Sequence, residues 1–381
     1  MHNSSYTIRT TINSGAHAYK RTNKKMYATK HFSEFKATRE AALQPPPEGP
    51  NSGYVVVKED DPHEETGTRC WRLCCQRRTK DLPFPQNKIF TVYFNIPVGQ
   101  AVATQTETVL FVPVMNLPLS ANRYYVVVAE GKYKGQVHTC SRKEDMTTCC
   151  FCRRITDAKP KPFDHRDIYQ QIEIIPHKGQ FIAKSVAPDG FVPWIFRQKY
   201  WDLYEEKSKS CHLGDAFGIN NAVRSNFLNL DIAINAIAGK WYCPFIFAKE
   251  SGELKDQMKK TTFYEVILEQ FWREAHSGIE KKRILLRGNE TMKEEMESSD
   301  GFVWFKRTGD FNSERIGLSV ALWERIKWEE NRNGWDEGVG SMKEEVEFGG
   351  FVLVERFSFK RLDGSLALAL EFIHTDKVRT G

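Results

Sequence analysis

A stretch near the C-terminus of this chain is written twice. The tetrapeptide Met-Lys-Glu-Glu occupies residues 292–295 and again 342–345, and in both copies a glycine and the pair Phe-Val follow it. The repeated units, residues 302–322 and 351–372, each end in a segment whose apolar residues alternate with period two, which is typical of a β-strand. Because a lone hairpin cannot bury a core, the duplication predicts two β-hairpins whose apolar faces share one core.

Two further segments extend this pattern. Residues 228–236 read Leu-Asn-Leu-Asp-Ile-Ala-Ile-Asn-Ala, which predicts a half-buried strand. Residues 241–247 and 263–272 resemble the two arms of a third hairpin. We therefore expect the C-terminal half to contain three related hairpins.

The first half of the chain also has a β-strand pattern. A segment rich in proline and glycine at 45–53 marks the start of folded structure, because proline lacks the amide donor that a central strand needs. Short β-branched or aromatic runs follow at turn-separated intervals, at residues 54–57, 89–94, 108–114 and 124–129. Such spacing favours a mainly β fold with some helix (α+β), built from antiparallel β-sheets or sandwiches.

A second proline break, Lys159-Pro160-Lys161-Pro162, suggests where domains meet. The sequence predicts a disordered basic arm and linker at residues 1–44. An N-terminal β-rich domain would then span 45–158, and a C-terminal β-rich domain with the hairpin repeats would span 163–381.

The formal net charge of +6 comes from the arm. Residues 1–33 carry six Lys or Arg and no Asp or Glu, whereas the rest of the chain has 49 basic and 49 acidic residues. Sequence-independent binding of nucleic acid needs cations clustered on the folded surface. The charge distribution therefore argues against a nucleic-acid partner.

The sequence also bears on location. The first forty residues have no apolar run of about 7–15 residues, the core of a secretory signal. No stretch reaches the roughly 18 apolar residues of a membrane span. We therefore expect a cytoplasmic protein. Residues 1–25 are basic and rich in hydroxyl groups, so a plastid or mitochondrial transit peptide is the alternative.

Two cysteine clusters stand beside arginine pairs. They consist of Cys70, Cys74 and Cys75, and of Cys149, Cys150 and Cys152. One interpretation is S-acylation, in which acyl chains and cations together hold a protein on a membrane surface. Metal binding is another, but adjacent cysteines make a poor zinc knuckle, and we predict no metal site. The third interpretation is reduced thiols without a special role.

Catalytic signals are weak. The chain has no G-x-S-x-G elbow and no complete phosphate-binding glycine motif, and it predicts no cofactor. His165, flanked by carboxylates, and His177 are candidate bases or ligands. Trp194 and Trp201 lie in an aromatic run that could form a ligand platform.

Several strings resemble one plant protein family, catalogued as domain of unknown function 1262. They include PPPEGPNSGY at 45–54, DLPFPQNK at 81–88, LSANRYYVV at 119–127 and DMTTCCFC at 145–152. The resemblance runs from about Met26 to the C-terminus and implies a plant source. It also implies a start near Met26, and it brings no catalytic residue, cofactor or substrate with it.

These observations favour a non-enzymatic, intracellular plant protein that binds a protein or a small ligand, or acts as a scaffold. Two alternatives stay open. One is an enzyme whose site is assembled only in the fold. The other is an S-acylated protein that associates peripherally with a membrane.

Overall fold

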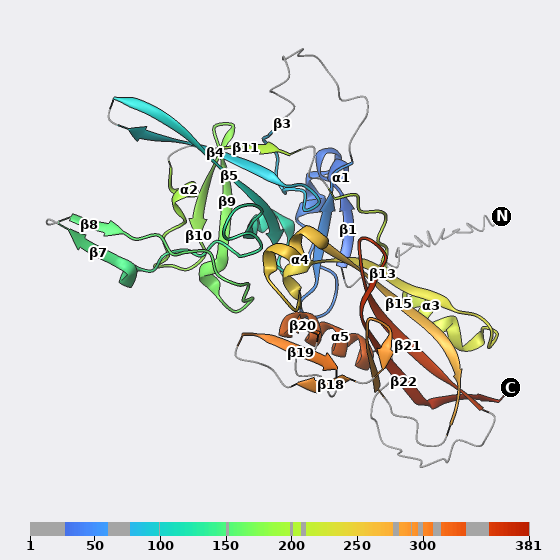
Figure 1. Cartoon of the computed structure of the whole chain (residues 1–381). Helices are drawn as coiled ribbons and strands as arrows, with labels where there is room; N and C mark the ends of the chain where they lie inside the picture. The colour runs from blue at the N-terminus through green and yellow to red at the C-terminus, as the bar shows by residue number, and fades with distance from the viewer. Residues whose placement is uncertain are drawn as a thin grey trace, which may run out of the picture.

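The chain forms a mainly β structure of antiparallel sheets, with a six-stranded barrel, a C-terminal antiparallel sheet and short helices between them. The computed structural model describes residues 27–59, 77–98, 100–149, 152–198, 201–206, 211–276, 282–290, 292–295, 300–307, 314–332 and 350–380. Figure 1 shows the barrel and the C-terminal sheet toward opposite ends of an elongated molecule. The fold class predicted from the sequence is confirmed.

The described chain begins with a small ordered unit. Its elements are β1 (Tyr27–His31), α1 (Phe32–Ala37), η1 (Arg39–Ala42) and β2 (Gly53–Val57), with β1 parallel to β2. Phe32 and Phe35 are buried against Val56. These aromatic anchors give residues 27–44 a fixed structure, so the expectation of a disordered arm is wrong for this part. Residues 1–26 lie outside the described residues.

Six antiparallel strands close into a barrel. They are β4 (Phe90–Val98), β5 (Ala101–Pro113), β6 (Arg123–Val128), β9 (Gln171–His177), β10 (Gln180–Ser185) and β11 (Trp201–Glu205). Phe181 of β10 lies opposite Trp201 of β11 and closes the ring, while β3 (Arg77–Thr79) pairs with residues 203–205 on the same edge of β11, the edge away from β4. Large side chains fill the interior, among them Phe84, Phe90, Phe111, Tyr124, Phe181 and Trp201. The inside of the barrel is therefore a packed core.

The barrel takes strands from both sides of the proline break at residues 159–162. Strands β4 to β6 precede the break and β9 to β11 follow it. The short helix η2 (Leu119–Ala121) connects β5 to β6. Between β6 and β9 lie η3 (Lys143–Asp145), η4 (Ile168–Gln170) and the hairpin of β7 (Met146–Cys149) and β8 (Cys152–Ile155). Hydrogen bonding thus continues across the break, and the division into domains stays a prediction.

The second half of the chain contributes two further sheets. The larger has the order β12 (Gly218–Ile219), β13 (Ala236–Pro244), β15 (Phe263–Glu274), β21 (Gly350–Arg361), β22 (Leu366–Thr380), β16 (Lys282–Leu286) and β17 (Asn289–Glu290). The smaller has the order β14 (Ala248–Glu250), β20 (Arg315–Ser319), β19 (Phe302–Arg307) and β18 (Met292–Glu295).

Short helices connect these strands. They are α2 (Trp194–Arg197), α3 (Asn221–Asn226), η6 (Phe227–Asn229), η7 (Phe245–Phe247), α4 (Leu254–Lys260) and α5 (Val320–Arg332). Within the described ranges, no helix combines the length and the hydropathy needed to cross a lipid bilayer.

The predicted hairpins are present. β19 pairs with β20, and β21 pairs with β22, each antiparallel, and side chains from both hairpins enter one core. The prediction was wrong for residues 320–322, which begin α5 instead of ending a strand. Leu322, Ile326 and Glu329 are buried at the spacing of one face of a helix. This helical pattern is longer than the strand-like alternation at residues 316–322, so the chain becomes helical from residue 320. Of the two Met-Lys-Glu-Glu copies, residues 292–295 form β18 and residues 342–345 lie outside the described part.

The third hairpin is also present, as β13 and β15, although residues 245–247 form η7. The strand predicted at residues 228–236 is wrong. The N–H of Ile234 bonds to the carbonyl of Asp231, and the carboxylate of Asp231 accepts from the N–H of Ala233. Asp and Asn side chains compete for backbone groups in this way, so the alternating pattern forms turns instead.

Candidate functional site

A two-stranded ribbon projects from the rim of the barrel. β4 and β5 pair from Phe90 opposite Val109 out to Val98 opposite Ala101. β11 pairs with residues 90–94 of β4, and β6 pairs with residues 109–113 of β5. Single hydrogen bonds at Thr108 and Val114 extend the second ladder by one residue at each end. The outer parts of both strands therefore extend beyond the ring, as Figure 1 shows.

In the described part of the chain, no strand pairs with the outer edge of β5 beyond the barrel. The N–H of Ala129 donates to the carbonyl of Thr108, and the N–H of Val114 donates to the carbonyl of Arg123, both on the side away from β4. In an antiparallel strand, both backbone groups of alternate residues point the same way. Beyond the barrel, the residues that direct N–H and C=O to the open edge are Val102, Thr104 and Thr106.

The outer edge of β4 is a poorer partner. Asn95 and Pro97 lie opposite Thr104 and Val102, so their backbone also faces outward. Proline has no N–H and is confined to such edges. The β4 edge therefore offers one donor, whereas the β5 edge offers three.

The ribbon carries no charge. Residues 89–106 contain no Asp, Glu, Lys, Arg or His, in a chain in which 27% of residues are charged. Val102 is 68% exposed, and Thr104, Gln105 and Thr106 are also exposed. Natural proteins protect open edges with charges, especially lysine. A long, exposed, neutral edge is therefore suited to adding another strand.

The base of the ribbon is held firmly. The rings of Tyr93 and Tyr204 meet edge to face at 4.9 Å. Glu107, the first charged residue after the neutral run, lies 3.0 Å from the Nε2 atom of buried His138. These contacts fix the direction in which the ribbon leaves the barrel.

The cysteine clusters are only partly described. Cys70, Cys74, Cys75 and Cys150 lie outside the described residues. Cys149 and Cys152 lie opposite each other at the outer end of the β7–β8 hairpin, which projects from the barrel in Figure 1. Within the described ranges, no group of three or more metal-ligating side chains converges.

The candidate histidines are not brought together. The carbonyl of His165 accepts from Tyr125, whose hydroxyl also accepts from Gln171 at the start of β9, whereas His177 ends that strand. At about 3.3 Å per residue, the length of β9 separates them by roughly 20 Å.

The two candidate tryptophans also have different environments. Trp194 is partly exposed at the start of α2, with the guanidinium of Arg197 5.9 Å from its ring. Trp201 is buried in the barrel, where its ring contacts Phe181 and Phe196. Only Trp194 could meet a ligand from solvent, so the predicted platform does not form as a unit.

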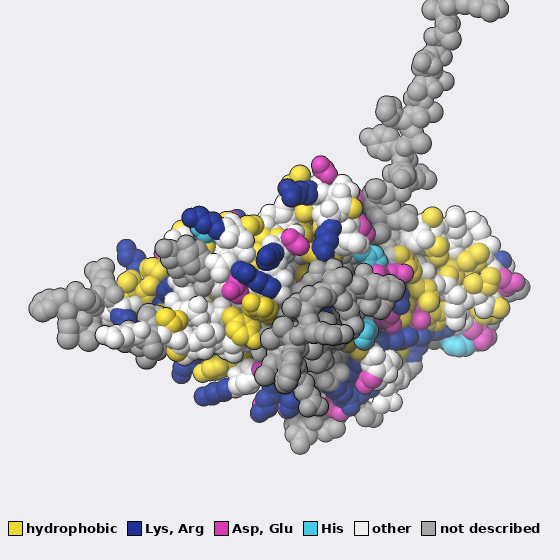
Figure 2. Space-filling view, turned by 90° about the horizontal axis from the view of Figure 1, so that it is seen from above, with side chains coloured by type: hydrophobic (Ala, Val, Ile, Leu, Met, Phe, Trp, Pro, Cys, Tyr) yellow, Lys and Arg dark blue, Asp and Glu magenta, His cyan; other side chains and the backbone are white. Residues whose placement is uncertain are grey.

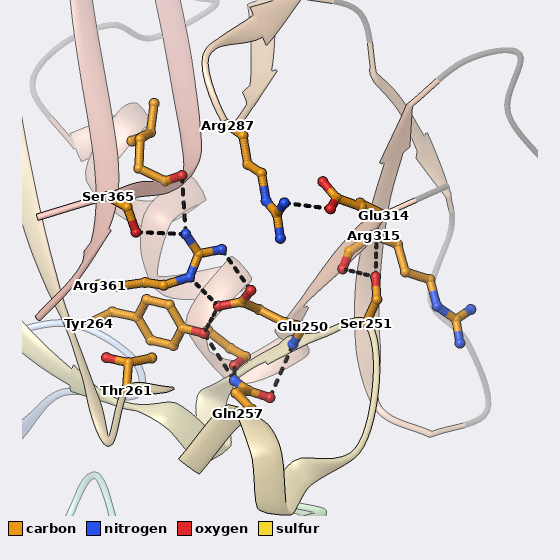
Figure 3. A network of polar contacts seen from close by, with 12 residues as sticks. Glu250, Ser251, Gln257, Thr261, Tyr264, Arg287, Glu314, Arg315, Arg361 and Ser365 are labelled. Carbon is orange, nitrogen blue, oxygen red and sulfur yellow. Dashed lines mark hydrogen bonds and ion pairs between the residues drawn. The ribbon is translucent and has the colours of Figure 1, made fainter. Parts of the chain in front are cut away.

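One polar network joins the two C-terminal sheets (Figure 3). The carboxylate of Glu250 accepts two hydrogen bonds from Arg361, at 2.7 and 2.6 Å, and one from the hydroxyl of Tyr264 at 2.6 Å. Burial raises the pKa of Glu250, whereas the hydrogen bonds from Arg361 and Tyr264 lower it. The second effect is larger, so the pKa lies below its ordinary value. A carboxylate held in this way stabilises the fold and is not free to act as a base.

A second network is more deeply buried. Arg224 of α3 donates to Glu355 of β21 through Nε and Nη2, and to Glu329 of α5 through Nη1. Glu329 also accepts from Arg325, which reaches the hydroxyl of Ser52. The network connects the C-terminal sheet to the segment before β2, so its role is structural.

The remaining described cysteines are not activated nucleophiles. Burial raises the pKa of Cys140 to about 11 and also raises the pKa of Cys211 and Cys243. A thiol of this kind stays protonated at neutral pH.

Two cavities lined by described residues beside the core are small. A crevice lined by Tyr27, Met115 and Phe247 holds about 20 Å³, and another beside Phe163 holds about 10 Å³. Each has room for about one water, far below the roughly 300 Å³ of a small-molecule site.

Figure 2 shows hydrophobic side chains gathered at the end of the molecule where the C-terminal sheet lies. Leu228, Ile234, Ile237 and Val378 are each 40–52% exposed. These residues come from a turn segment and two strands. They offer apolar area without the directional backbone groups of the ribbon.

The ribbon was not among the sites predicted from the sequence. A search for chemically reactive residues passes over a neutral segment. The sequence offered one sign of this site, the long charge-free run at residues 89–106. That the run is exposed to solvent could be seen only in the fold.

The fold is that of a β-rich protein with a six-stranded barrel, from which the ribbon of β4 and β5 projects. Residues 48–151 match the family model described as "Protein of unknown function (DUF1262)", so the resemblance drawn from the sequence is confirmed for this segment. It includes β4, β5 and the whole ribbon.

Other comparisons add little. No match was found among curated proteins. Matches among solved structures include the crystal structure of Cry35Ab1, with a TM-score of 0.39 and 10% identity, covering 78% of this chain and 90% of that chain. A similarity at this level carries no argument about function.

Proposed function

We propose that this protein is a non-enzymatic binding or scaffold protein, and that it recognises a polypeptide in extended conformation. The partner segment adds as a strand to the open edge of β5, from Ala101 to Glu107. The observation that carries the proposal is the exposed, charge-free edge with three outward N–H and three outward C=O groups.

The chemistry of the edge defines the partner. Main-chain hydrogen bonds supply affinity in strand addition, and alternate side chains supply specificity. Val102, Thr104 and Thr106 lie on one face of the ribbon and Ala103 and Gln105 on the other. A segment rich in β-branched and neutral polar residues fits both faces, because it leaves no charge unpaired.

The anchored base of the ribbon supports the same function. Binding is stronger when the receiving element is already ordered, because less conformational entropy is lost. The contacts at Tyr93 and Glu107 hold the ribbon in place before a partner arrives.

A displayed library of random 12-residue peptides tests the proposal. The protein is immobilised at low density, so that copies cannot meet, and selected peptides are counter-screened against Thr104→Pro. This substitution removes an outward N–H and leaves the backbone hydrogen bonds between β4 and β5 in place. It also removes the side-chain bond from Thr104 to Asn95 of β4, which the control variant loses as well. Thr104→Val, which keeps the N–H, is the matched control.

We expect neutral, β-branched peptides that bind the wild type and Thr104→Val but not Thr104→Pro. Hydrogen exchange should show slower exchange in residues 101–107 when such a peptide is bound. Peptides that bind all three proteins equally, or no enrichment at all, would rule out the edge as a receptor.

A second candidate function concerns the β7–β8 hairpin. Cys149 and Cys152 lie opposite each other at its outer end, and Arg153 and Arg154 follow in the sequence, so two acylation sites stand beside two cationic residues. Two chains, or one chain with a basic patch, hold a protein stably on a membrane. Fractionation of plant cells with and without hydroxylamine tests this, with Cys→Ser changes at Cys149, Cys150 and Cys152 as controls.

We infer a cytoplasmic location. Cys140, Cys211 and Cys243 are free thiols, which is typical of a reducing compartment. A fluorescent fusion of the full chain in plant cells tests the location, and a signal confined to plastids or mitochondria would favour the transit-peptide alternative instead.

A further inference from the structure

The β5 edge can pair with a copy of itself. Its open part, Ala101 to Glu107, is seven residues long, which is an ordinary length for a strand. When two identical strands meet antiparallel about a two-fold axis, the residue numbers of each opposite pair add up to the same total. Odd-numbered and even-numbered side chains of β5 point to different faces of the ribbon. Opposite residues must therefore be both odd or both even, so that their side chains lie on the same face.

One register uses the whole edge. With the axis at Thr104, Thr104 lies opposite its own copy, Val102 lies opposite Thr106, and Ala103 lies opposite Gln105. Because the outward groups belong to residues 102, 104 and 106, each N–H meets a C=O of the other copy. The three donors and three acceptors of each copy are then all satisfied, which gives six hydrogen bonds.

The side chains agree with this register. Thr opposite Thr is a favourable cross-strand pair, and Val opposite Thr places two residue types together that are enriched in strands. No like charges meet, because the edge has no charge before Glu107, and Glu107 lies opposite Ala101. A register centred on Ala103 would leave Thr106 opposite the turn residue Gln100 and would lose two of the bonds.

We propose that the strand added to the β5 edge is β5 of a second copy, so that the chain forms an antiparallel, two-fold dimer centred on Thr104. This inference rests on the proposed function, because it names the partner of the same edge. The other edge of the ribbon has Pro97 at an outward position, so that pairing stops at two copies.

Mass measurement by light scattering over a dilution series is the first test. The wild type and Thr104→Val should approach twice the 44.1 kDa of the chain at high concentration. Thr104→Pro should remain a monomer with an unchanged circular dichroism spectrum. A dimer that persists in Thr104→Pro would overturn the proposal.

Disulfide trapping tests the register. Thr104→Cys should form a cross-linked dimer under mild oxidation, because opposite Cα atoms about 5.5 Å apart suit a disulfide. Val102→Cys alone and Thr106→Cys alone should not cross-link, whereas a mixture of the two should. The tryptic peptide 89–123 contains no native cysteine, so its disulfide-linked forms come only from the introduced residues. Cross-linking of Val102→Cys alone would exclude this register.

The two proposals fail differently. A wild type that is monomeric throughout, but binds library peptides at residues 101–107, would overturn the dimer and leave the proposed function standing. A monomer that selects no peptide would overturn both.

Discussion

The guanidinium of Arg224 makes two hydrogen bonds of 2.6 Å to the carboxylate of Glu355, and neither side chain is exposed. The two residues are 131 positions apart, and their contact joins α3 to the centre of the C-terminal sheet. A buried ion pair is costly to form but more costly to break, because removing one partner leaves a charge without solvent.

Arg224→Ala should therefore lower the free energy of unfolding by about 3–5 kcal/mol. Urea denaturation followed by tryptophan fluorescence measures this. Lys259→Ala removes a pair with Asp256 that is exposed on α4, and it should cost less than about 1 kcal/mol. Equal effects of the two substitutions would contradict the structural role of Arg224.

Stability should also fall at acid pH through Glu355. Burial raises the pKa of Glu355, but the charge and hydrogen bonds of Arg224 outweigh burial and hold the pKa at about 2, below its ordinary value of 4.5. Since the folded pKa is the lower one, the stabilisation is complete above pH 4.5 and is lost as the pH falls toward 2. Urea denaturation between these limits should show a shallower pH dependence for Glu355→Gln than for the wild type. Parallel curves would mean that other carboxylates dominate.

Leu368→Asp should abolish soluble expression. Leu368 is fully buried in β22, and a charge placed there without a partner costs several kcal/mol, of the order of a large core truncation. Val378→Asp on the same strand is the matched control, because Val378 is 48% exposed. The soluble fraction of expressed protein distinguishes them, and a soluble Leu368→Asp protein would mean that this face of the strand is not core.

The thiols should be reduced and unequal in reactivity. In denaturant without reductant, all nine cysteines should titrate with a thiol reagent, and elemental analysis should find no stoichiometric zinc. In the native protein, Cys140 and Cys243 should react most slowly, because both are buried and burial raises their pKa. One zinc per chain, or fewer than nine thiols, would show that the clusters at Cys70–Cys75 and Cys149–Cys152 are ligated or modified.

The hairpins could be predicted from the sequence because their signal is local. In β21 and β22, alternating apolar residues and an intervening turn specify both strands. Residues 228–236 show the same alternation but form turns. The carboxylate of Asp231 accepts a hydrogen bond from the N–H of Ala233, and in a strand that N–H would be free to bond to a neighbouring strand. Periodicity alone does not distinguish these outcomes.

The polar networks could not be predicted in this way. Arg224 is 105 residues from Glu329 and 131 from Glu355, and nothing near any of the three indicates the others. His165, His177 and Trp201 were candidates because of residue type. The fold then separates the histidines and buries Trp201, so residue type was a poor guide to position.

Closure of the barrel between Phe181 and Trp201 bears on how this chain is synthesised. The segment that matches the family model, residues 48–151, holds three of the six barrel strands, and the other three lie within residues 171–205. A nascent chain that has left the ribosome only as far as residue 151 exposes Phe90, Phe111 and Tyr124 with no opposite wall to cover them. The segment that the family model matches is therefore shorter than the smallest piece that can fold around this core. An excised 48–151 fragment should aggregate, whereas a fragment that continues past Glu205 has every strand of the ring.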